Sequence, residues 1–298
     1  MNRREVPMIG MISYGEDRLR QGGFVTVPLD ESFSIDPTRL RPHYHDFFQV
    51  SLLVGDGALM HDFRESRTSG ATLFFLSPGQ VHTIMPKPKM TGTIVSFTRE
   101  FIEAGGEDGF LMNLPFYYTA VNAPWLRLKD EQVAEVKEIF RQLQQEYDRA
   151  QDGAAEIVRS LLRILFVKAA RWHAVDSPVV GRGRQAILAR RFRQEIERHH
   201  HEWLTLEPYA KSLGVTVNHL NDAVRQETGQ AAGEHLRQRR LLDAKRRLLH
   251  STMSVSEIGY GLGFDDPSYF SRFFKRYEGM TPAEFRIKIR EKYQKDSG

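Results

Sequence analysis

The sequence contains no cysteine, which excludes a disulfide framework, a thiolate metal site and a cysteine nucleophile. It also has no long hydrophobic run, because its most apolar stretch, LLRILFV at 161–167, is interrupted by Arg163. The first residues lack the apolar core of a secretory signal. These absences argue against a transmembrane helix and predict a cytoplasmic protein that does not bind a membrane.

Motifs of common enzyme classes are missing as well. There is no G-x-S-x-G, no phosphate-binding loop of the Walker type and no H-E-x-x-H. The run at 198–201, RHHH, resembles a metal site. Successive residues on a helix point in different directions, however, so we interpret this run as the surface end of a helix. The sequence therefore predicts a protein that is not an enzyme, with no catalytic residue and no cofactor.

Charge is unevenly distributed along the chain. The 298 residues are 41% hydrophobic and 27% charged, which suits two globular domains of about 150 residues each. Residues 181–298 carry 22 lysines and arginines against 15 aspartates and glutamates, whereas the first 180 residues carry 20 against 23. A basic C-terminal part beside a mildly acidic remainder indicates a nucleic-acid-binding domain joined to a domain of another kind.

Residues 1–125 are predicted to form a domain of strands. Short apolar runs are separated by turns that contain glycine, proline or aspartate: FFQVSLLV at 47–54, ATLFFLSPG at 71–79 and GTIVSF at 92–97. Many short strands with regular turns are typical of a sandwich or barrel such as a jelly roll.

From Leu126 the spacing of apolar residues becomes helical. One seam recurs at intervals of three and four residues: Val133, Val136, Phe140, Leu143 and Tyr147. A second helix is expected at 154–173. We interpret 126–174 as a dimerisation segment that uses this seam in a homodimer, and the alternative is a helix pair packed on the barrel. Residues 175–182 are predicted to be a linker.

Residues 183–298 are predicted to be helical, with short breaks. Two helix pairs stand out, 206–212 with 217–228 and 255–260 with 267–278. Each pair breaks at a glycine, Gly214 or Gly263, which is the plan of a helix-turn-helix unit. The helix between the pairs, 233–249, would be about 25 Å long. With its flanking turns, it would bring the two second helices near the ~34 Å repeat of B-DNA.

The densest motif is SVSEIGYGLGFDDPSYFSRFFKRYEGMTPAEFR at 254–286, preceded by RLLDAKRRLL at 240–249 and LEPYAKSLGVT at 206–216. This stretch resembles the AraC/XylS family of bacterial transcription regulators. The resemblance implies a sequence-specific regulator that binds double-stranded DNA, with RNA polymerase as a candidate further partner. Helical spacing in the last pair predicts a core face: Phe270, Phe273, Phe274 and Tyr277.

The resemblance also implies which residues face DNA. They are Asn218, Asn221 and Asp222 in the first pair and Pro267, Ser268, Ser271 and Arg272 in the second. Arg225, Lys275 and Arg276 are further candidates for contact with DNA. Asn221 could pair with adenine or simply be solvated, and Arg272 could contact a base or phosphate, or pair with Asp265 or Asp266. Further residues are candidates for phosphate contacts: Arg237, Arg240, Lys245, Arg246 and Arg247.

The motifs RPHYHDFFQVSLLVGDG and FFLSPGQVH resemble the cupin-like sensor domain of the same family. This implies a barrel that holds a small-molecule effector, for which carbohydrate, aromatic acid and fatty acid all stay open. The residues expected to line its site are His43, His45, Phe47, Gln49 and His82. The arm at 8–24 would close the site with Tyr14 or Phe24.

A metal-binding cupin has an H-x-H pair, a glutamate four residues later and a further histidine after a Pro-Gly turn. His43, His45 and His82 fit this pattern, but Gln49 occupies the carboxylate position, so we expect no bound metal. Three imidazoles could still bind Zn²⁺, Fe²⁺ or Ni²⁺. The alternative function is therefore a metal-dependent cupin enzyme fused to a DNA-binding regulatory domain.

The predicted fold class is α+β and multidomain. It combines an N-terminal cupin-like β jelly roll, a helix pair, and a C-terminal all-α domain with two helix-turn-helix units. Effector binding would act by changing the relative placement of the two DNA-binding domains in a dimer, which requires different effector affinities in the two arrangements.

Overall fold

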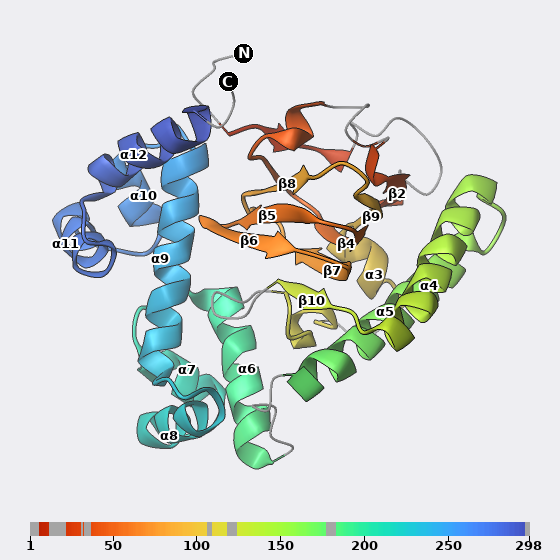
Figure 1. Ribbon diagram of the computed structural model, residues 1–298. Coiled ribbons are helices and arrows are strands. Elements are labelled where there is room, and N and C mark those ends of the chain that lie inside the picture. The colour runs from red at the N-terminus through yellow and green to blue at the C-terminus, as the bar shows by residue number, and fades with distance from the viewer. Residues whose placement is uncertain are drawn as a thin grey trace. The chain divides into compact units, whose positions relative to one another are not determined.

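The computed structural model describes residues 6–11, 22–30, 32, 37–105, 109–117, 124–176 and 183–295 (Figure 1). The chain divides into two compact units, one over Val6–His173 and one that includes Ala174–Gly298. In the described residues the first unit is rich in strands and the second is helical. The predicted fold class, a sheet-rich domain followed by a helical domain, is confirmed.

The N-terminal unit contains two main antiparallel sheets. In hydrogen-bonding order, the larger sheet is formed by β10 (Trp125–Arg127), β7 (Ala71–Leu76), β4 (Phe48–Val54), β9 (Thr91–Phe97) and β2 (Phe24–Pro28). The smaller sheet is formed by β6 (Arg64–Thr68), β5 (Gly57–His61) and β8 (His82–Pro86). The remaining short elements are β1 (Met8–Ile9), which pairs in parallel with β3 (Tyr44–His45), η2 (Pro37–Leu40), α3 (Arg99–Glu103) and η3 (Leu111–Asn113).

Strand β4 is buried on both faces. Successive side chains of a strand point to opposite sides, so an apolar run can serve two cores at once. Phe48 and Val50 belong to a core shared with helices, whereas Phe47 and Leu53 belong to a core that also contains Leu59 of β5. The larger sheet therefore lies between a helical layer and the smaller sheet, which explains the continuous hydrophobic run at 47–54.

The helical layer consists of α4 (Asp130–Arg149) and α5 (Ala154–Asp176). Val136, Phe140 and Leu143 of the expected dimerisation seam are buried in the core that this layer forms with the larger sheet. Val133 and Tyr147 are partly buried and pack against the same core. The prediction that this seam forms a homodimer surface is therefore wrong, because the seam packs on the larger sheet of its own chain. This is the alternative arrangement, a helix pair packed on the barrel.

The described part of the C-terminal unit consists of α6 (Arg184–His199), α7 (Leu206–Ser212), α8 (Val217–Thr228), α9 (Ala232–His250), α10 (Val255–Gly261), α11 (Pro267–Glu278) and α12 (Pro282–Lys295). Local capping signals start several of them. The Thr216 hydroxyl accepts a hydrogen bond from the His219 amide at 3.2 Å, and Ser254 and Glu257 form a reciprocal capping box. Such caps satisfy amides that have no partner within the helix.

The aromatic core of the C-terminal unit differs in part from the expected one. Phe270 and Phe274 are fully buried, as predicted. Phe273 is only partly buried, and Tyr277 is 37% exposed because it lies at the end of α11. Across the described residues, we find no helix with the length and hydrophobicity needed to cross a membrane.

Candidate DNA-binding surface and buried histidine cluster

Two helix-turn-helix units lie within the C-terminal unit, α7 with α8 and α10 with α11. Their turn glycines, Gly214 and Gly263, have φ values of 70° and 78°, a conformation that favours glycine. In α8 and α11 one face is buried, through residues such as Leu220 and Val224 or Phe270 and Phe274, and most polar residues lie on the exposed face, where α11 also exposes Tyr269. Each second helix can therefore present a fixed polar face to a ligand while its other face builds the core.

The exposed face of α8 includes three of the predicted DNA-facing residues, Asn218, Asp222 and Arg225. The opposite face is formed by buried residues such as Leu220 and Val224. His219 is also exposed here but was not selected from the sequence. Its position directly after Asn218 in the first turn of the helix is the signal that could have identified it.

Asn221 has a different environment from its neighbours on α8. It is partly buried, and its Oδ1 accepts a hydrogen bond from the Ala232 amide at 2.9 Å. This bond ties α8 to the start of α9 and uses the oxygen that a bidentate contact with adenine would require. The prediction that Asn221 reads a base is therefore corrected: its side chain connects α8 to the start of α9.

The exposed face of α11 is more basic than that of α8. Ser268, Lys275 and Arg276 are exposed, and the side chain of Arg272 is 71% exposed. Arg272 Nη2 lies 3.8 Å from Asp266 Oδ2, which is the alternative pairing that the sequence suggested. Such an exposed contact contributes little in water.

Ser271 also lies on α11 but is only partly exposed. Its hydroxyl donates a hydrogen bond to the Pro267 carbonyl at 2.9 Å. A serine hydroxyl that bonds back to the preceding turn in this way is engaged within its own helix.

The five residues of α9 that the sequence predicts to contact phosphate have contacts within the C-terminal unit. Arg240 and Arg246 are buried, with 5% and 7% exposure. The other three form ion pairs: Arg237 with Glu234, Lys245 with Glu278, and Arg247 with Asp243. Burial argues against phosphate contacts by Arg240 and Arg246, whereas phosphate contacts by Arg237, Lys245 and Arg247 stay a prediction. A sequence shows the charge of such residues but not the partner that neutralises it.

In the N-terminal unit, three of the predicted effector-binding residues are brought together. The His82 ring centroid lies 4.3 Å from that of His43 and 4.8 Å from that of His45. The His45 ring stacks on Phe47 at 4.1 Å. A fourth histidine, His61, is paired across the small sheet with His82 and is 6% exposed; the sequence reasoning missed it because the two are far apart in the chain.

His45 is the member of this cluster with two unsatisfied ring nitrogens. It is 1% exposed, and neither nitrogen has a hydrogen-bond partner among the described residues. By contrast, the Nδ1 atoms of His43 and His82 lie 2.8 and 2.9 Å from backbone carbonyl oxygens. Burial, together with the neighbouring His43, lowers the pKa of His45 to about 3, and the same causes lower the pKa of His82 well below its usual value. Both imidazoles are therefore neutral at physiological pH.

The other residues expected at this site have mixed outcomes. Gln49 is buried and its amide donates to the Ser51 hydroxyl at 3.0 Å. Phe24 does not act as a lid, since it is fully buried in the core and stacks on Phe101. Tyr14 lies outside the described residues. Among the residues that the structure describes, no group of three or more histidine, aspartate or glutamate side chains is placed to hold a metal ion.

Comparison with protein families assigns both parts of the chain. Residues 35–166 match the AraC-like ligand binding domain, and residues 209–288 match a helix-turn-helix domain. The chain belongs to the AraC family of transcription regulators. In this regulator the first match covers most of the strands and much of α4 and α5, and the second runs from α7 to α12.

Individual known proteins are similar to this chain to different extents. The HTH-type transcriptional activator RhaR of Enterobacter sp. (strain 638) is 26% identical over 251 residues, which cover 84% of this chain and 88% of the relative. Among solved structures, the C-terminal domain of AraT, a response regulator from Geobacillus stearothermophilus, is 33% identical over 36% of this chain and 88% of that domain, with a TM-score of 0.34. ToxT from Vibrio cholerae is 13% identical over 89% of this chain and 98% of its own, with a TM-score of 0.42.

Proposed function

We propose that this AraC-family regulator inserts α8 and α11 into two successive segments of the DNA major groove, and that a small molecule bound in the N-terminal barrel controls this binding. The observation that carries the proposal is the common construction of the two helices. Buried residues such as Leu220 of α8 and Phe270 of α11 fix the orientation of each exposed polar face. In helix-turn-helix proteins the second helix enters the groove in this way.

The exposed residues of α11 would make two kinds of contact. Arg272 lies in the first half of α11 and extends into solvent, so its guanidinium could reach a base edge. Lys275 and Arg276 lie a turn later, where contacts with phosphate would position the helix without reading sequence. Ser268 lies near the start of the same exposed face, at the end expected to enter the groove.

The experiment is a binding titration of the full-length chain over a randomised duplex library at several salt concentrations. Arg272→Ala should cost about 1–3 kcal/mol on the selected site and relax base preference in one half-site. Lys275→Ala should weaken binding to all duplexes similarly and lower the salt slope by about one. Equal losses of specific and non-specific affinity in Arg272→Ala would assign Arg272 to phosphate, and no duplex binding at low salt would overturn the proposal.

For the effector, we propose a site centred on His45. A buried polar group without a partner is costly, and a small molecule with hydrogen-bonding groups would satisfy both ring nitrogens. We include His43, Phe47, Gln49 and His82 in this site because they are buried and lie beside His45 in space or along the chain.

A thermal-shift screen of small molecules tests the effector site. A compound at 100 times its dissociation constant should add about 2.7 kcal/mol to the stability of the regulator. His45→Leu should abolish this gain, whereas His219→Leu, at an exposed position in the other unit, should leave it unchanged. A compound that stabilises His45→Leu as much as the wild type would place the effector elsewhere.

We also propose a homodimer, formed through α5 rather than through the buried α4 seam. Ile157, Ile164 and Val167 are 46%, 47% and 41% exposed and recur on one side of the helix. In a two-fold dimer the same stripe of a second copy would cover them. Contact with RNA polymerase stays a prediction.

Sedimentation tests the homodimer. The wild type should sediment as a dimer and the Ile164→Asp variant as a monomer. The Ile287→Asp variant, changed at a 61% exposed isoleucine of α12, should still sediment as a dimer. A wild-type chain that sediments as a monomer at micromolar concentration, with and without DNA, would refute self-association.

A further inference from the structure

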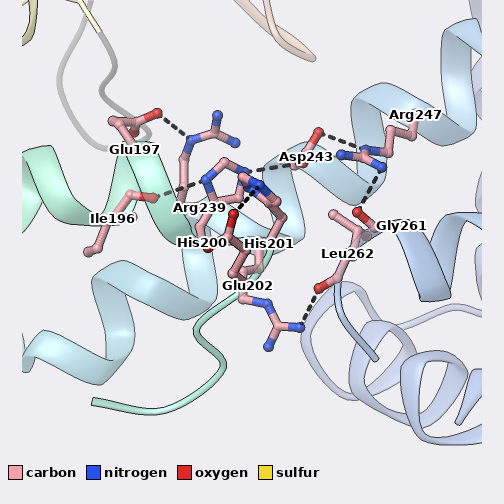
Figure 2. A network of polar contacts seen from close by, with 11 residues as sticks. Ile196, Glu197, His200, His201, Glu202, Arg239, Asp243, Arg247, Gly261 and Leu262 are labelled. Atoms are coloured by element: carbon pink, nitrogen blue, oxygen red, sulfur yellow. Dashed lines mark hydrogen bonds and ion pairs between the residues drawn. The ribbon is translucent and has the colours of Figure 1, made fainter. Parts of the chain in front are cut away.

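A group of polar contacts joins α6, α9 and α10 near the middle of α9, and Asp243 is at its centre (Figure 2). Asp243 Oδ2 accepts a hydrogen bond from His200 Nε2 at 3.2 Å, next to the end of α6. Its two oxygens also accept from Nε and Nη2 of Arg247, both at 3.2 Å. Nearby, Arg239 of α9 pairs with Glu197 of α6 at 2.8 Å. These contacts connect the long central helix to the helix that precedes the first helix-turn-helix unit.

The surroundings keep the Asp243 carboxyl ionised. Burial by itself would raise its pKa, but the hydrogen bond from His200 and the charges of Arg239 and Arg247 hold the pKa of Asp243 well below its usual value. The carboxylate is therefore a permanent anion at the junction, and it orients the arginine that continues the contacts toward α10.

Two arginines of α9 bind the end of α10. Arg247 Nη1 donates to the Gly261 carbonyl at 3.0 Å, and Arg240 Nη2 donates to the Leu262 carbonyl at 2.9 Å. Carbonyls at a helix end lack partners inside the helix, so these donors act as caps. The Arg240 guanidinium also lies 4.1 Å from the centroid of the Phe264 ring. Because α10 has only seven residues, it depends on such tertiary contacts for its stability and position.

The turn that follows α10 closely approaches the connection between α6 and α7, within the C-terminal unit. At Gly263, a Cβ atom would lie 2.2 Å from the carbonyl oxygen of His201, which belongs to the connection between α6 and α7. No side chain fits at this point. In the second helix-turn-helix unit, Glu278 at the end of α11 pairs with Lys245 of α9 at 2.9 Å. The second helix-turn-helix unit is thus held at its first helix, its turn and its last helix.

We propose that Asp243, Arg240 and Arg247, here called the α9 cluster, are positioning residues that fix α11 relative to α8 and thereby set the half-site spacing that the regulator accepts. This inference rests on the proposed use of both helices in the major groove. The three side chains have their polar contacts inside the unit, so they would act through the placement of α11. One base pair inserted between half-sites shifts them by about 3.4 Å and rotates them by about 35°, which a rigid pair of helices cannot follow.

The test uses the full-length chain and the duplex selected from the randomised library. Nuclease protection first locates the two contacted groove segments, and a series of duplexes then has one or two base pairs inserted or removed between them. The measured quantity is the ratio of the affinities for the matched and shifted duplexes. The wild type should show a ratio of about tenfold or more. Asp243→Asn should bind the matched duplex more weakly and show a ratio of about threefold or less, since α11 can then follow the shift.

Substitutions of Arg247 separate positioning from phosphate binding. Lysine keeps the charge but cannot bond Asp243 through two nitrogens and Gly261 through a third. If Arg247 positions α11, Arg247→Lys and Arg247→Met should both lose spacing discrimination with an unchanged salt slope. If Arg247 binds phosphate instead, Arg247→Lys should resemble the wild type and Arg247→Met should lower the salt slope by about one. Glu291→Gln, which removes an exposed carboxylate from α12, is the matched control.

Circular dichroism and thermal unfolding establish that each variant is folded. Should Asp243→Asn fail to fold, Arg247→Lys carries the same test at a side chain that is 28% exposed. Folded variants of Asp243 and Arg247 that keep the wild-type ratio would overturn the role of the α9 cluster. If the wild-type protein protects only one groove segment and binds matched and shifted duplexes equally well, the proposed use of two helices is overturned instead. The two failures are therefore distinguishable.

Discussion

The two units of this regulator bury polar side chains in different ways. In the C-terminal unit, Asp243 accepts hydrogen bonds from His200 and Arg247, and the buried Arg240 donates to a backbone carbonyl. In the N-terminal unit, His45 is 1% exposed, and neither of its ring nitrogens has a hydrogen-bond partner in the part of the chain that the structure describes. Removing such groups from water costs free energy in both units. Bonds within the chain offset this cost at Asp243 and, in part, at Arg240, whose Nε has no partner among the described residues, whereas no such bond offsets it at His45.

This difference distinguishes framework residues from residues available to a ligand. A buried polar group whose bonds are made inside the chain stabilises one arrangement of helices. A buried polar group without a partner leaves a bond for another molecule to make. On this basis, charged residues of α9 belong to the framework, whereas His45 belongs to the effector site, although both are ionisable and buried.

The largest expected effect comes from placing leucine at one position in each unit. Asp243→Leu should lower the free energy of unfolding by about 4 kcal/mol, because it leaves His200 and Arg247 without their anionic partner. His45→Leu should change it by less than about 1 kcal/mol at pH 7.5, since no hydrogen bond is lost. Denaturant unfolding followed by circular dichroism measures both. Equal losses in the two variants would contradict the comparison.

The turn at Gly263 should not tolerate a side chain, because its backbone lies close to the connection between α6 and α7. Gly263→Ala should cost about 3 kcal/mol, because the new Cβ meets the His201 carbonyl and the positive φ adds strain. Gly214→Ala is the matched control, since its φ is similar but nothing lies within 4 Å of the added atom. It should cost about 1 kcal/mol. The difference in denaturation midpoint between the two variants measures the effect of the close approach, and similar midpoints would refute it.

Acidification tests the unpaired histidine. His45 has an ordinary pKa of 6.5 when unfolded and a pKa of about 3 when folded, because of burial and the nearby His43. Between these values the unfolded chain binds more protons, so stability falls as the pH falls, by about 1.4 kcal/mol per pH unit. From pH 6.5 to 5 the loss is about 2 kcal/mol. His45→Leu should remove this part of the slope in urea titrations at each pH, and an unchanged slope would contradict the buried neutral state.

The smallest expected effect concerns Asp222, an exposed carboxylate that belongs neither to the framework nor to the effector site. Asp222→Asn on α8 should raise affinity for every duplex by about two- to threefold at low salt, because the carboxylate repels phosphates. The gain should shrink as salt increases, and stability should change by less than about 0.5 kcal/mol. Glu291→Gln again serves as the control. A loss confined to the selected duplex would instead identify Asp222 as an acceptor for a cytosine amino group.

The helix boundaries near the DNA-binding surface could be predicted from local signals. The expected helices 206–212, 217–228 and 267–278 coincide with α7, α8 and α11. Their start and stop signals act within a few residues of the chain: a capping hydroxyl at Thr216, proline after Asp266, and a left-handed glycine at each end. The exposed positions of Arg225 and Arg272 follow from the same spacing.

Assignments that depend on contacts between distant segments could not be made in this way. The periodicity of the α4 seam is the same whether it meets a second copy or its own sheet, and only the packed structure shows that Leu143 is buried in the chain's own core. Asn221 was expected at a base, but its oxygen is bonded to an amide eleven residues later. His61 joins the histidine cluster through a strand pairing that its sequence neighbours do not indicate.

The order of the elements, the two helix-turn-helix units and the family can be inferred from the amino-acid sequence, because capping residues, glycine turns and motif spacing lie within short stretches of chain. Which charges are exposed to solvent depends instead on how the helices pack. Arg240 and Arg272 are both arginines in a basic segment, yet one is 5% exposed and bonded to a carbonyl while the side chain of the other is 71% exposed. Residue type states that a charge exists, whereas its partner and its exposure depend on segments that meet only when the chain folds.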